Sequence, residues 1–132
     1  MSRRVSRTLA WTLSAAWASA IFVVSSRPGN TLPGGYSVQA HLAEYFVLGA
    51  LLTWALADEQ PSVSTVGLAI ILASLYGITD EFHQRFVFMR TPDIFDWMLD
   101  TVGATLGALA VRALLTRAAR QGTRDDPPVA PQ

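Results

Sequence analysis

The stretch from Val63 to Arg85, VSTVGLAIILASLYGITDEFHQR, decides the fold, because a long and largely apolar segment leads directly into charged and amide side chains. The apolar part, Val63–Thr79, approaches the roughly 20 residues that a helix needs to cross a bilayer. Asp80, Glu81 and His83 follow at its end. Hydrocarbon does not solvate such groups, so they must face protein or water, and they usually mark function. The sequence therefore predicts a polar site within a membrane protein.

Three further segments have a similar length and apolar character, so we predict an all-α membrane protein with a bundle of four transmembrane helices. The four segments are approximately Thr8–Val24, Ala40–Ala57, Val63–Thr79 and Asp93–Leu115. Clusters of proline, glycine and polar residues separate them and end each helix. At 132 residues, 51% hydrophobic and 15% charged, the chain suits one domain. We expect an N-terminus at residues 1–7, the bundle at residues 8–116 and a disordered polar tail at residues 117–132.

The distribution of arginine predicts the orientation of this bundle. With the N-terminus inside, the inner flanks hold Arg3, Arg4, Arg7, Arg117, Arg120 and Arg124, and the outer flanks hold Arg27, Arg85 and Arg90. Positive side chains are enriched on the cytoplasmic side, so both termini are predicted to be cytoplasmic. The alternative for the first segment is a cleaved signal peptide ending near Ala18-Ser19-Ala20, although Ile21–Val24 continues the apolar run beyond that point.

Under this topology the ionisable residues of three segments gather at one depth, near the outer surface. The second segment starts with His41, Glu44 and Tyr45, the third ends with Asp80, Glu81, His83 and Gln84, and the fourth starts with Asp93, Asp96 and Asp100. We therefore predict that these residues converge in one outward-facing pocket. The alternative is a set of polar anchors in the membrane interface, where His and Tyr are common.

Helical spacing predicts which of these side chains share a face. Asp96, Asp100, Gly103 and Gly107 follow one another at intervals of four, three and four residues. A Gly-x-x-x-Gly pair lets a second helix approach closely, so this face is expected to point into the bundle. In the third segment, Tyr76, Asp80 and His83 share one face and Gly77, Glu81 and Gln84 an adjoining one, and Glu81 and Arg85 are spaced for an ion pair.

Composition and motifs exclude several classes of function. The formal net charge is zero, which gives no bulk attraction to nucleic acid. The chain has no cysteine, so disulfides, thiolate metal sites and cysteine nucleophiles are absent. It also lacks serine-hydrolase, P-loop and dinucleotide-binding motifs.

A metal or other cofactor is left open by the residues themselves. His41-x-x-Glu44 and Asp80-x-x-His83 each pair an imidazole with a carboxylate at helical spacing. Such pairs occur in carboxylate-bridged metal sites of helical bundles, but the defining Glu-x-x-His order is not repeated here. The sequence therefore determines neither metal content nor cofactor.

Several of these motifs together resemble the VanZ-like family of small bacterial membrane proteins, named after an accessory protein of teicoplanin resistance. The resemblance covers roughly Val24 to Val111. It rests on Ser25-Ser26-Arg27-Pro28-Gly29, His41-Leu42-Ala43-Glu44-Tyr45 with Leu48-Gly49, Asp80-Glu81-Phe82-His83-Gln84, Arg90-Thr91-Pro92, and Asp96-x-x-x-Asp100-Thr101-x-Gly103. The chain departs from the family at Phe88-Met89, where members commonly carry Pro-Gly, so the tight turn before Arg90 is not carried over.

The leading hypothesis is a binding or accessory module of the bacterial inner membrane. Its outward-facing site would bind an anionic or polar headgroup, such as that of a lipid-linked envelope precursor. The expected ligand-binding residues are His41, Glu44, Tyr45, Asp80, Glu81, His83, Gln84, Arg90, Asp96 and Asp100, with Arg85 helping Arg90 to hold phosphate. The resemblance implies a link to glycopeptide resistance by name.

Two alternatives belong to other classes of protein. An enzyme acting on a lipid or cell-wall precursor would use Glu81, His83 or Asp100 as catalytic groups, with or without a metal. A proton- or ion-coupled transporter would use Asp80, His83 and Asp100 as a relay and would favour a homodimer, because four helices enclose little pathway.

Overall fold

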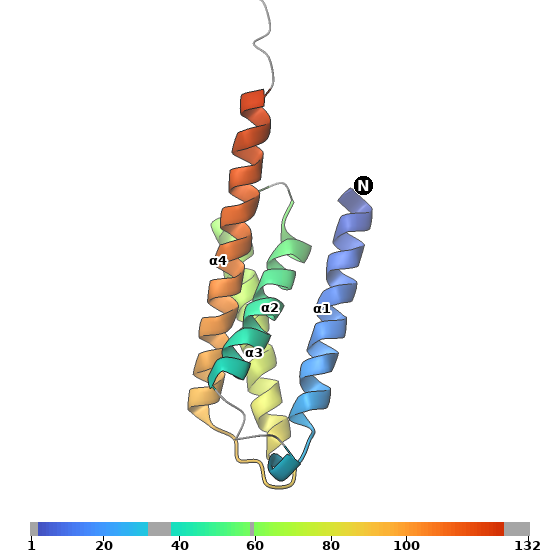
Figure 1. Cartoon of the computed structure of the whole chain (residues 1–132), viewed down its shortest axis with the longest axis vertical. Helices are drawn as coiled ribbons and strands as arrows, with labels where there is room; N and C mark the ends of the chain where they lie inside the picture. Colours follow the sequence, from blue (N-terminus) through green and yellow to red (C-terminus); the bar gives the residue numbers. More distant parts are fainter. Residues whose placement is uncertain (1–2, 32–37, 59, 126–132) are drawn as a thin grey trace, which may run out of the picture.

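The protein is all-helical, with four long helices running alternately up and down (Figure 1). The computed structural model describes residues 3–31, 38–58 and 60–125. The helices are α1 (Arg3–Ser25), α2 (Val38–Leu56), α3 (Val63–Gln84) and α4 (Ile94–Asp125), and a short 3-10 helix, η1 (Gly29–Thr31), follows α1. The ends of α1 and α3 and the starts of α2 and α4 lie together at the lower end of Figure 1, beside η1. The predicted helical class is therefore confirmed.

Three of the helices are long and apolar enough to cross a membrane, over Ser6–Ser25, Val63–Gln84 and Ile94–Gln121. These helices turn large apolar side chains outward. On α3, for example, the buried face carries Ala69, Ala73 and Gly77, whereas Ile71 and Leu75 are more than half exposed. Such a helix would be costly in water, because large exposed apolar patches are rare on soluble monomers. Hydrocarbon accepts this face without cost, so these helices suit a bilayer.

Helix α2 occupies the centre of the bundle and contacts α1, α3 and α4. Its most extensive contact is with α4. A Cβ added at Gly103 or Gly107 would collide with the backbone of Leu42 or Phe46, and one added at Gly49 would collide with the backbone of Ala104. The two helices therefore meet backbone to backbone, as small residues permit. The prediction that the Gly103–Gly107 face points into the bundle is confirmed.

Helix α1 packs on the other side of α2 and also reaches α3. The Trp17 Nε1–H group donates to the Glu44 carbonyl oxygen at 2.9 Å, and the Tyr76 hydroxyl donates to the Ala18 carbonyl oxygen at 2.6 Å. Ile21 is buried in the core cluster. Residues around the signal-peptide-like Ala18-Ser19-Ala20 are thus integral to the packing of this helix.

Helix α4 is longer than its predicted segment and continues to Asp125. The prediction of a disordered tail from residue 117 therefore needs correction for residues 117–125, and residues 126–132 lie outside the described part of the chain. A helix that is already nucleated propagates at little cost through Arg117-Ala118-Ala119-Arg120, because alanine and arginine are strong helix formers.

The loop between α3 and α4 forms a tight turn although Phe88-Met89 stands where the resemblance predicted Pro-Gly. Met89 takes the left-handed conformation, with φ 57. The Gly29 N–H group donates to the Phe88 carbonyl oxygen at 3.1 Å, and a Cβ on Gly29 would strike the Met89 carbonyl oxygen. The close approach of η1 thus holds the turn in a conformation that a non-glycine residue adopts only at a cost.

Candidate functional site

The centre of the candidate site is a buried pair formed by His41 of α2 and Asp100 of α4. The His41 Nδ1 and Asp100 Oδ1 atoms are 2.9 Å apart, and the two side chains are 2% and 0% exposed. The backbone contact of α2 with α4 places them together, because Gly103 lies one turn beyond Asp100 and packs on Leu42. The residues that close the helices on each other therefore also align this pair.

Asp96 approaches the same imidazole from the preceding turn of α4. Its Oδ2 atom lies 3.6 Å from His41 Nε2, and its side chain is 32% exposed. This distance is too long for a hydrogen bond but close enough for an electrostatic contact. His41 thus has a carboxylate on each ring nitrogen, one buried and one open toward the end of the bundle.

Glu81, in the last turn of α3, completes the cluster. Its Oε2 atom accepts the Asp93 backbone N–H group at 2.8 Å. Asp93 in turn caps α4, since its Oδ1 atom accepts the Phe95 N–H group at 2.8 Å. One N or O atom each of His41, Glu81 and Asp100 lies within 4.8 Å of the other two. Three helices therefore contribute one chemical group each to a single point.

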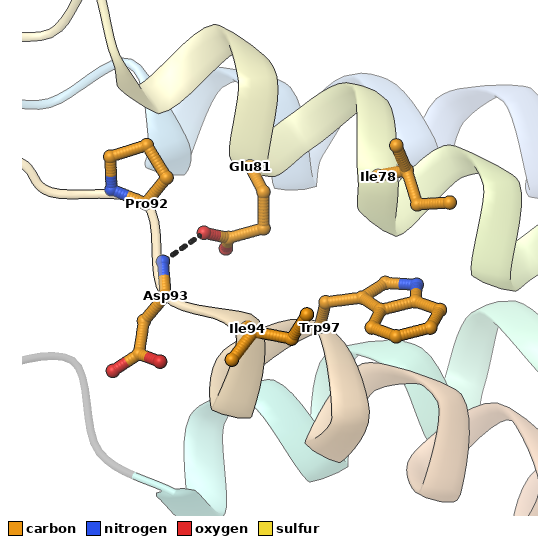
Figure 2. A pocket seen from close by; sticks show the side chains of 6 residues that line it. All are labelled: Ile78, Glu81, Pro92, Asp93, Ile94 and Trp97. Atoms are coloured by element: carbon orange, nitrogen blue, oxygen red, sulfur yellow. Dashed lines mark hydrogen bonds between the residues drawn. The ribbon is translucent and has the colours of Figure 1, made fainter.

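A pocket of about 320 Å³ opens beside Glu81, between the end of α3 and the start of α4. Figure 2 shows the Glu81 carboxylate meeting the Asp93 backbone nitrogen, while the Asp93 carboxylate points away from it. The pocket is lined by Ile78, Glu81, Pro92, Asp93, Ile94 and Trp97. The Trp97 Nε1–H group is held by Ser74, 3.2 Å from its carbonyl oxygen and 3.1 Å from its hydroxyl. One wall is thus fixed, and the walls are mostly apolar around a single buried carboxylate.

Several buried oxygen atoms around this cluster lack a hydrogen-bond partner within the described part of the chain. They are Glu81 Oε1, Asp100 Oδ2 and the Tyr45 hydroxyl. Gly77 leaves room for them, because a Cβ there would lie 3.3 Å from Asp100 Oδ2 and 3.4 Å from the Tyr45 ring. Buried oxygens usually have partners. Their concentration at one point indicates a place for a bound group.

Asp80, next to Glu81 in sequence, points about 100° away from it around α3 and turns toward α1. Its Oδ2 atom accepts the Ser25 hydroxyl at 2.8 Å and the Gln84 amide at 3.4 Å. His83 lies on the same side, with Nε2 2.9 Å from the Ser26 hydroxyl and its ring 4.5 Å from that of Phe22. Together with the Tyr76 contact to α1, this confirms that Tyr76, Asp80 and His83 share one face.

The predicted site residues thus separate into two groups. His41, Tyr45, Glu81, Asp96 and Asp100 surround the centre between α2, α3 and α4, whereas Asp80, His83 and Gln84 lie at the contact with α1. Glu44 is half-buried on α2, and Arg90 is half-buried in the loop before α4. Among the described residues, Glu81 does not form the ion pair with Arg85, because its carboxylate turns to the Asp93 N–H group instead.

Sequence reasoning missed the neutral residues that hold these groups in place. Ser25 binds Asp80, and Trp97 with Ser74 forms the pocket wall. Thr101 extends this contact, with its hydroxyl 2.8 Å from that of Ser74. Two signals were available: Ser25 and Thr101 stand within the quoted family motifs, and Trp97 stands one turn before Asp100 and Thr101 on α4. A hydroxyl or an indole is common in such helices, so spacing alone did not distinguish these residues.

The family model described as VanZ/LLP1 matches residues 10–116 of the chain. This match covers most of the chain and confirms the resemblance carried by the sequence motifs. A search of curated proteins found no match. A search of solved structures also found none.

Proposed function

The chain belongs to the VanZ/LLP1 family, and on that premise we propose that it is a multi-pass inner-membrane protein whose outer end binds a polar lipid headgroup. The ligand class would be the phosphate-bearing headgroup of a lipid or of a lipid-linked envelope precursor. The pocket beside Glu81 is the observation that carries this proposal.

The proposed topology has four spans with both termini in the cytoplasm. Helix α2 would be the fourth span, since its 19 residues extend roughly 28 Å and approach the hydrocarbon thickness of about 30 Å. Its polar residues do not oppose this, because α1, α3 and α4 surround the helix and shield His41 from lipid. The excess of arginine at the other end of the bundle supports the orientation.

The pocket suits a molecule that is partly apolar and partly polar. Ile78, Ile94 and Trp97 offer apolar walls for the start of a lipid chain, and Glu81 offers an acceptor for a hydroxyl or amine. Pockets of this composition typically orient ligands through a few polar groups. The loop that borders the pocket also carries Arg85 and Arg90, whose planar guanidinium groups would bind a phosphate with two hydrogen bonds.

The surface around this loop supports a place in the membrane interface. The exposed side chains there are large and apolar: Phe82, Phe86, Phe88, Met89, Ile94 and Phe95. Aromatic residues at the end of a span settle at headgroup depth. The pocket would therefore lie where headgroups are.

Binding can be tested with a polyprenyl phosphate and the matching prenyl alcohol, using native mass spectrometry of the full chain in detergent. We expect retention of the phosphate but not of the alcohol. Arg90→Ala should weaken retention at least tenfold, and Arg90→Lys should weaken it less, because lysine keeps the charge but not the fork. Arg112→Ala, at the far end of α4, serves as the control. Equal retention of phosphate and alcohol would refute the proposal.

The orientation can be tested by single-cysteine labelling, since the chain contains no cysteine. Phe88→Cys should react with an impermeant thiol reagent in intact cells, because Phe88 is 72% exposed in the proposed outer loop. Gly122→Cys should react only after the cells are opened. The reverse pattern would invert the topology and place the pocket on the cytoplasmic side.

A second candidate function, hydrolysis of a lipid or cell-wall precursor, is favoured by the His41–Asp100 pair. A carboxylate that holds one ring nitrogen orients an imidazole as a general base. His41 Nε2 lies on the side of Asp96, the more exposed of the two carboxylates. Turnover of the retained lipid by wild type but not by His41→Gln would favour this function over binding alone.

A further inference from the structure

The point where α2, α3 and α4 each contribute one group has the composition of a metal site. We propose that His41, Glu81 and Asp100 bind one divalent transition-metal ion such as Zn²⁺. The ligands all belong to this chain, so the metal site does not depend on headgroup binding.

The distances between the donor atoms suit a single ion. Ligand atoms about 2.1 Å from a tetrahedral ion lie roughly 3.4 Å from one another. The His41 Nδ1 to Asp100 Oδ1 distance is 2.9 Å. Asp96 stands 3.6 Å from the other ring nitrogen, Nε2, so it is not a ligand of the same ion. Donor atoms of His41, Glu81 and Asp100 all lie within 4.8 Å of one another. Rotations of the carboxylates would bring these atoms into the first coordination sphere without moving a helix.

The oxygen atoms that would receive the ion are buried and have no other described role. Asp100 Oδ2 and Glu81 Oε1 lack hydrogen-bond partners within the described part of the chain, although both residues are at least nine-tenths buried. The other oxygen of Glu81 is fixed by the Asp93 N–H group. The other oxygen of Asp100 lies 2.9 Å from His41 Nδ1, a contact that the ion would replace. This arrangement matches metal sites, in which hydrogen bonds orient the ligating carboxylates.

Charge also favours a cation at this point. Even with a protonated imidazole, ionised Glu81 and Asp100 leave the three groups with a net charge of −1. Buried carboxylates are stable when they are paired or coordinate a metal. A divalent ion would balance Glu81 and Asp100 while His41 stays neutral, and Asp96 would face the remaining His41 Nε2–H group outside the coordination sphere.

The donor types select among the common metal ions. Zn²⁺ and its first-row neighbours bind imidazole together with carboxylate, whereas Mg²⁺ and Ca²⁺ prefer oxygen alone. An ion held by groups from three helices would also link α2, α3 and α4. It would lie next to the pocket that Glu81 lines, where its charge would attract a phosphate.

The test uses the full chain in detergent, stripped of metal with a chelator and then dialysed against Zn²⁺ or Mg²⁺. Elemental analysis should find one Zn²⁺ per chain and no stoichiometric Mg²⁺. Zn²⁺ should also raise the unfolding temperature. Replacement by Co²⁺ should give a visible absorption spectrum that His41→Gln changes.

The variants are chosen to keep the local hydrogen bonds. Asp100→Asn can still accept from His41, and Glu81→Gln can still accept from the Asp93 N–H group, so both should fold. Each should weaken Zn²⁺ binding at least tenfold. Asp58→Asn, an exposed carboxylate paired with Arg7 at the other end of the bundle, is the matched control. Wild-type chain that retains less than one Zn²⁺, or affinity unchanged by both site variants, would overturn the proposal. If the wild-type chain binds Zn²⁺ but does not retain the polyprenyl phosphate, the result counts against the headgroup function alone.

Discussion

The two sides of the last turn of α3 differ in chemistry although their carboxylates are neighbours in sequence. On the side of α1, the single carboxylate of Asp80 receives neutral donors from Ser25 and Gln84. On the side of α2 and α4, several carboxylates gather around one imidazole. Within the described residues, buried oxygens without a partner occur on both sides, Asp80 Oδ1 on one and Glu81 Oε1 and Asp100 Oδ2 on the other. Neutral donors around one carboxylate hold two helices together. Several carboxylates around one imidazole are suited to bind something further.

The difference also extends to how the helices meet. The α1 contact uses side chains, such as Trp17 and Tyr76, that bond to backbone carbonyls. The contact of α2 with α4 uses glycines at which the backbones touch. Side-chain contacts tolerate small shifts, whereas backbone contacts do not. The cluster around His41 and Asp100 thus lies on the helix contact that tolerates the smallest shifts.

The largest effect is expected from breaking the backbone contact with Gly107→Leu. The new side chain would collide with the Phe46 backbone and separate α2 from α4. Overpacking of a core with a larger side chain costs roughly 1–3 kcal/mol. A side chain that collides with the backbone of a neighbouring helix should cost more, because the backbone cannot move aside. Thermal unfolding in detergent should show a large loss of stability. Retention of the polyprenyl phosphate should also be lost, because His41 and Asp100 would no longer be held together. Gly67→Ala is the control, because nothing lies within 4 Å of its added Cβ; it should stabilise slightly. Equal effects of the two variants would contradict the packing.

A smaller effect is expected from replacing Asp100. Asp100→Leu removes the acceptor from buried His41 and should cost about 1–3 kcal/mol of unfolding free energy. It should keep the bundle inserted but abolish lipid retention. Asp100→Asn keeps an acceptor for His41, so its loss of stability should be smaller. If the Leu and Asn variants behave alike in both measurements, the hydrogen bond to His41 is not what orders the site.

The variants Ser25→Ala and Glu81→Gln test the difference between the two sides of α3. Ser25 contacts Asp80 on the α1 side, and Glu81 faces the cluster between α2 and α4. Ser25→Ala removes a donor to Asp80 and should cost about 1 kcal/mol of stability, with retention of the polyprenyl phosphate unchanged. In the metal-free chain, Glu81→Gln should leave stability nearly unchanged and weaken retention. Measuring unfolding and retention on both variants separates the two roles. A Ser25→Ala variant that loses retention would show that the α1 side also belongs to the site.

The smallest effect is expected from Met89→Gly in the turn before α4. Glycine adopts a positive φ without steric cost, but it also makes the unfolded chain more flexible. We expect a change in unfolding free energy of less than about 1 kcal/mol, in the stabilising direction. Gly29→Ala in the facing segment should be clearly destabilising, because its Cβ would strike the Met89 carbonyl oxygen. A destabilised Met89→Gly variant would mean that the methionine side chain, 64% exposed, anchors the turn.

Sequence by itself determined the helical class of the protein and which polar residues share a helix face. Apolar segments of bilayer length required helices, because hydrocarbon offers no partner for an open backbone. Helical spacing placed Asp96, Asp100, Gly103 and Gly107 on one face, and the structure packs that face against α2. The family followed from several short motifs in order, and its model matches residues 10–116. These features are local or periodic, so they can be read without knowing which helices touch.

Only the tertiary structure decided how the polar residues divide between partners. Asp80 and Glu81 are adjacent and chemically alike, yet one bonds to Ser25 and the other to the Asp93 N–H group. Successive residues on a helix point about 100° apart, so each meets whichever helix covers its side. The centre formed by His41, Glu81 and Asp100 depends on the relative rotation of three helices. That rotation is set by where glycines allow backbones to touch and by the turn at Met89, which are properties of the packed bundle and not of any one segment.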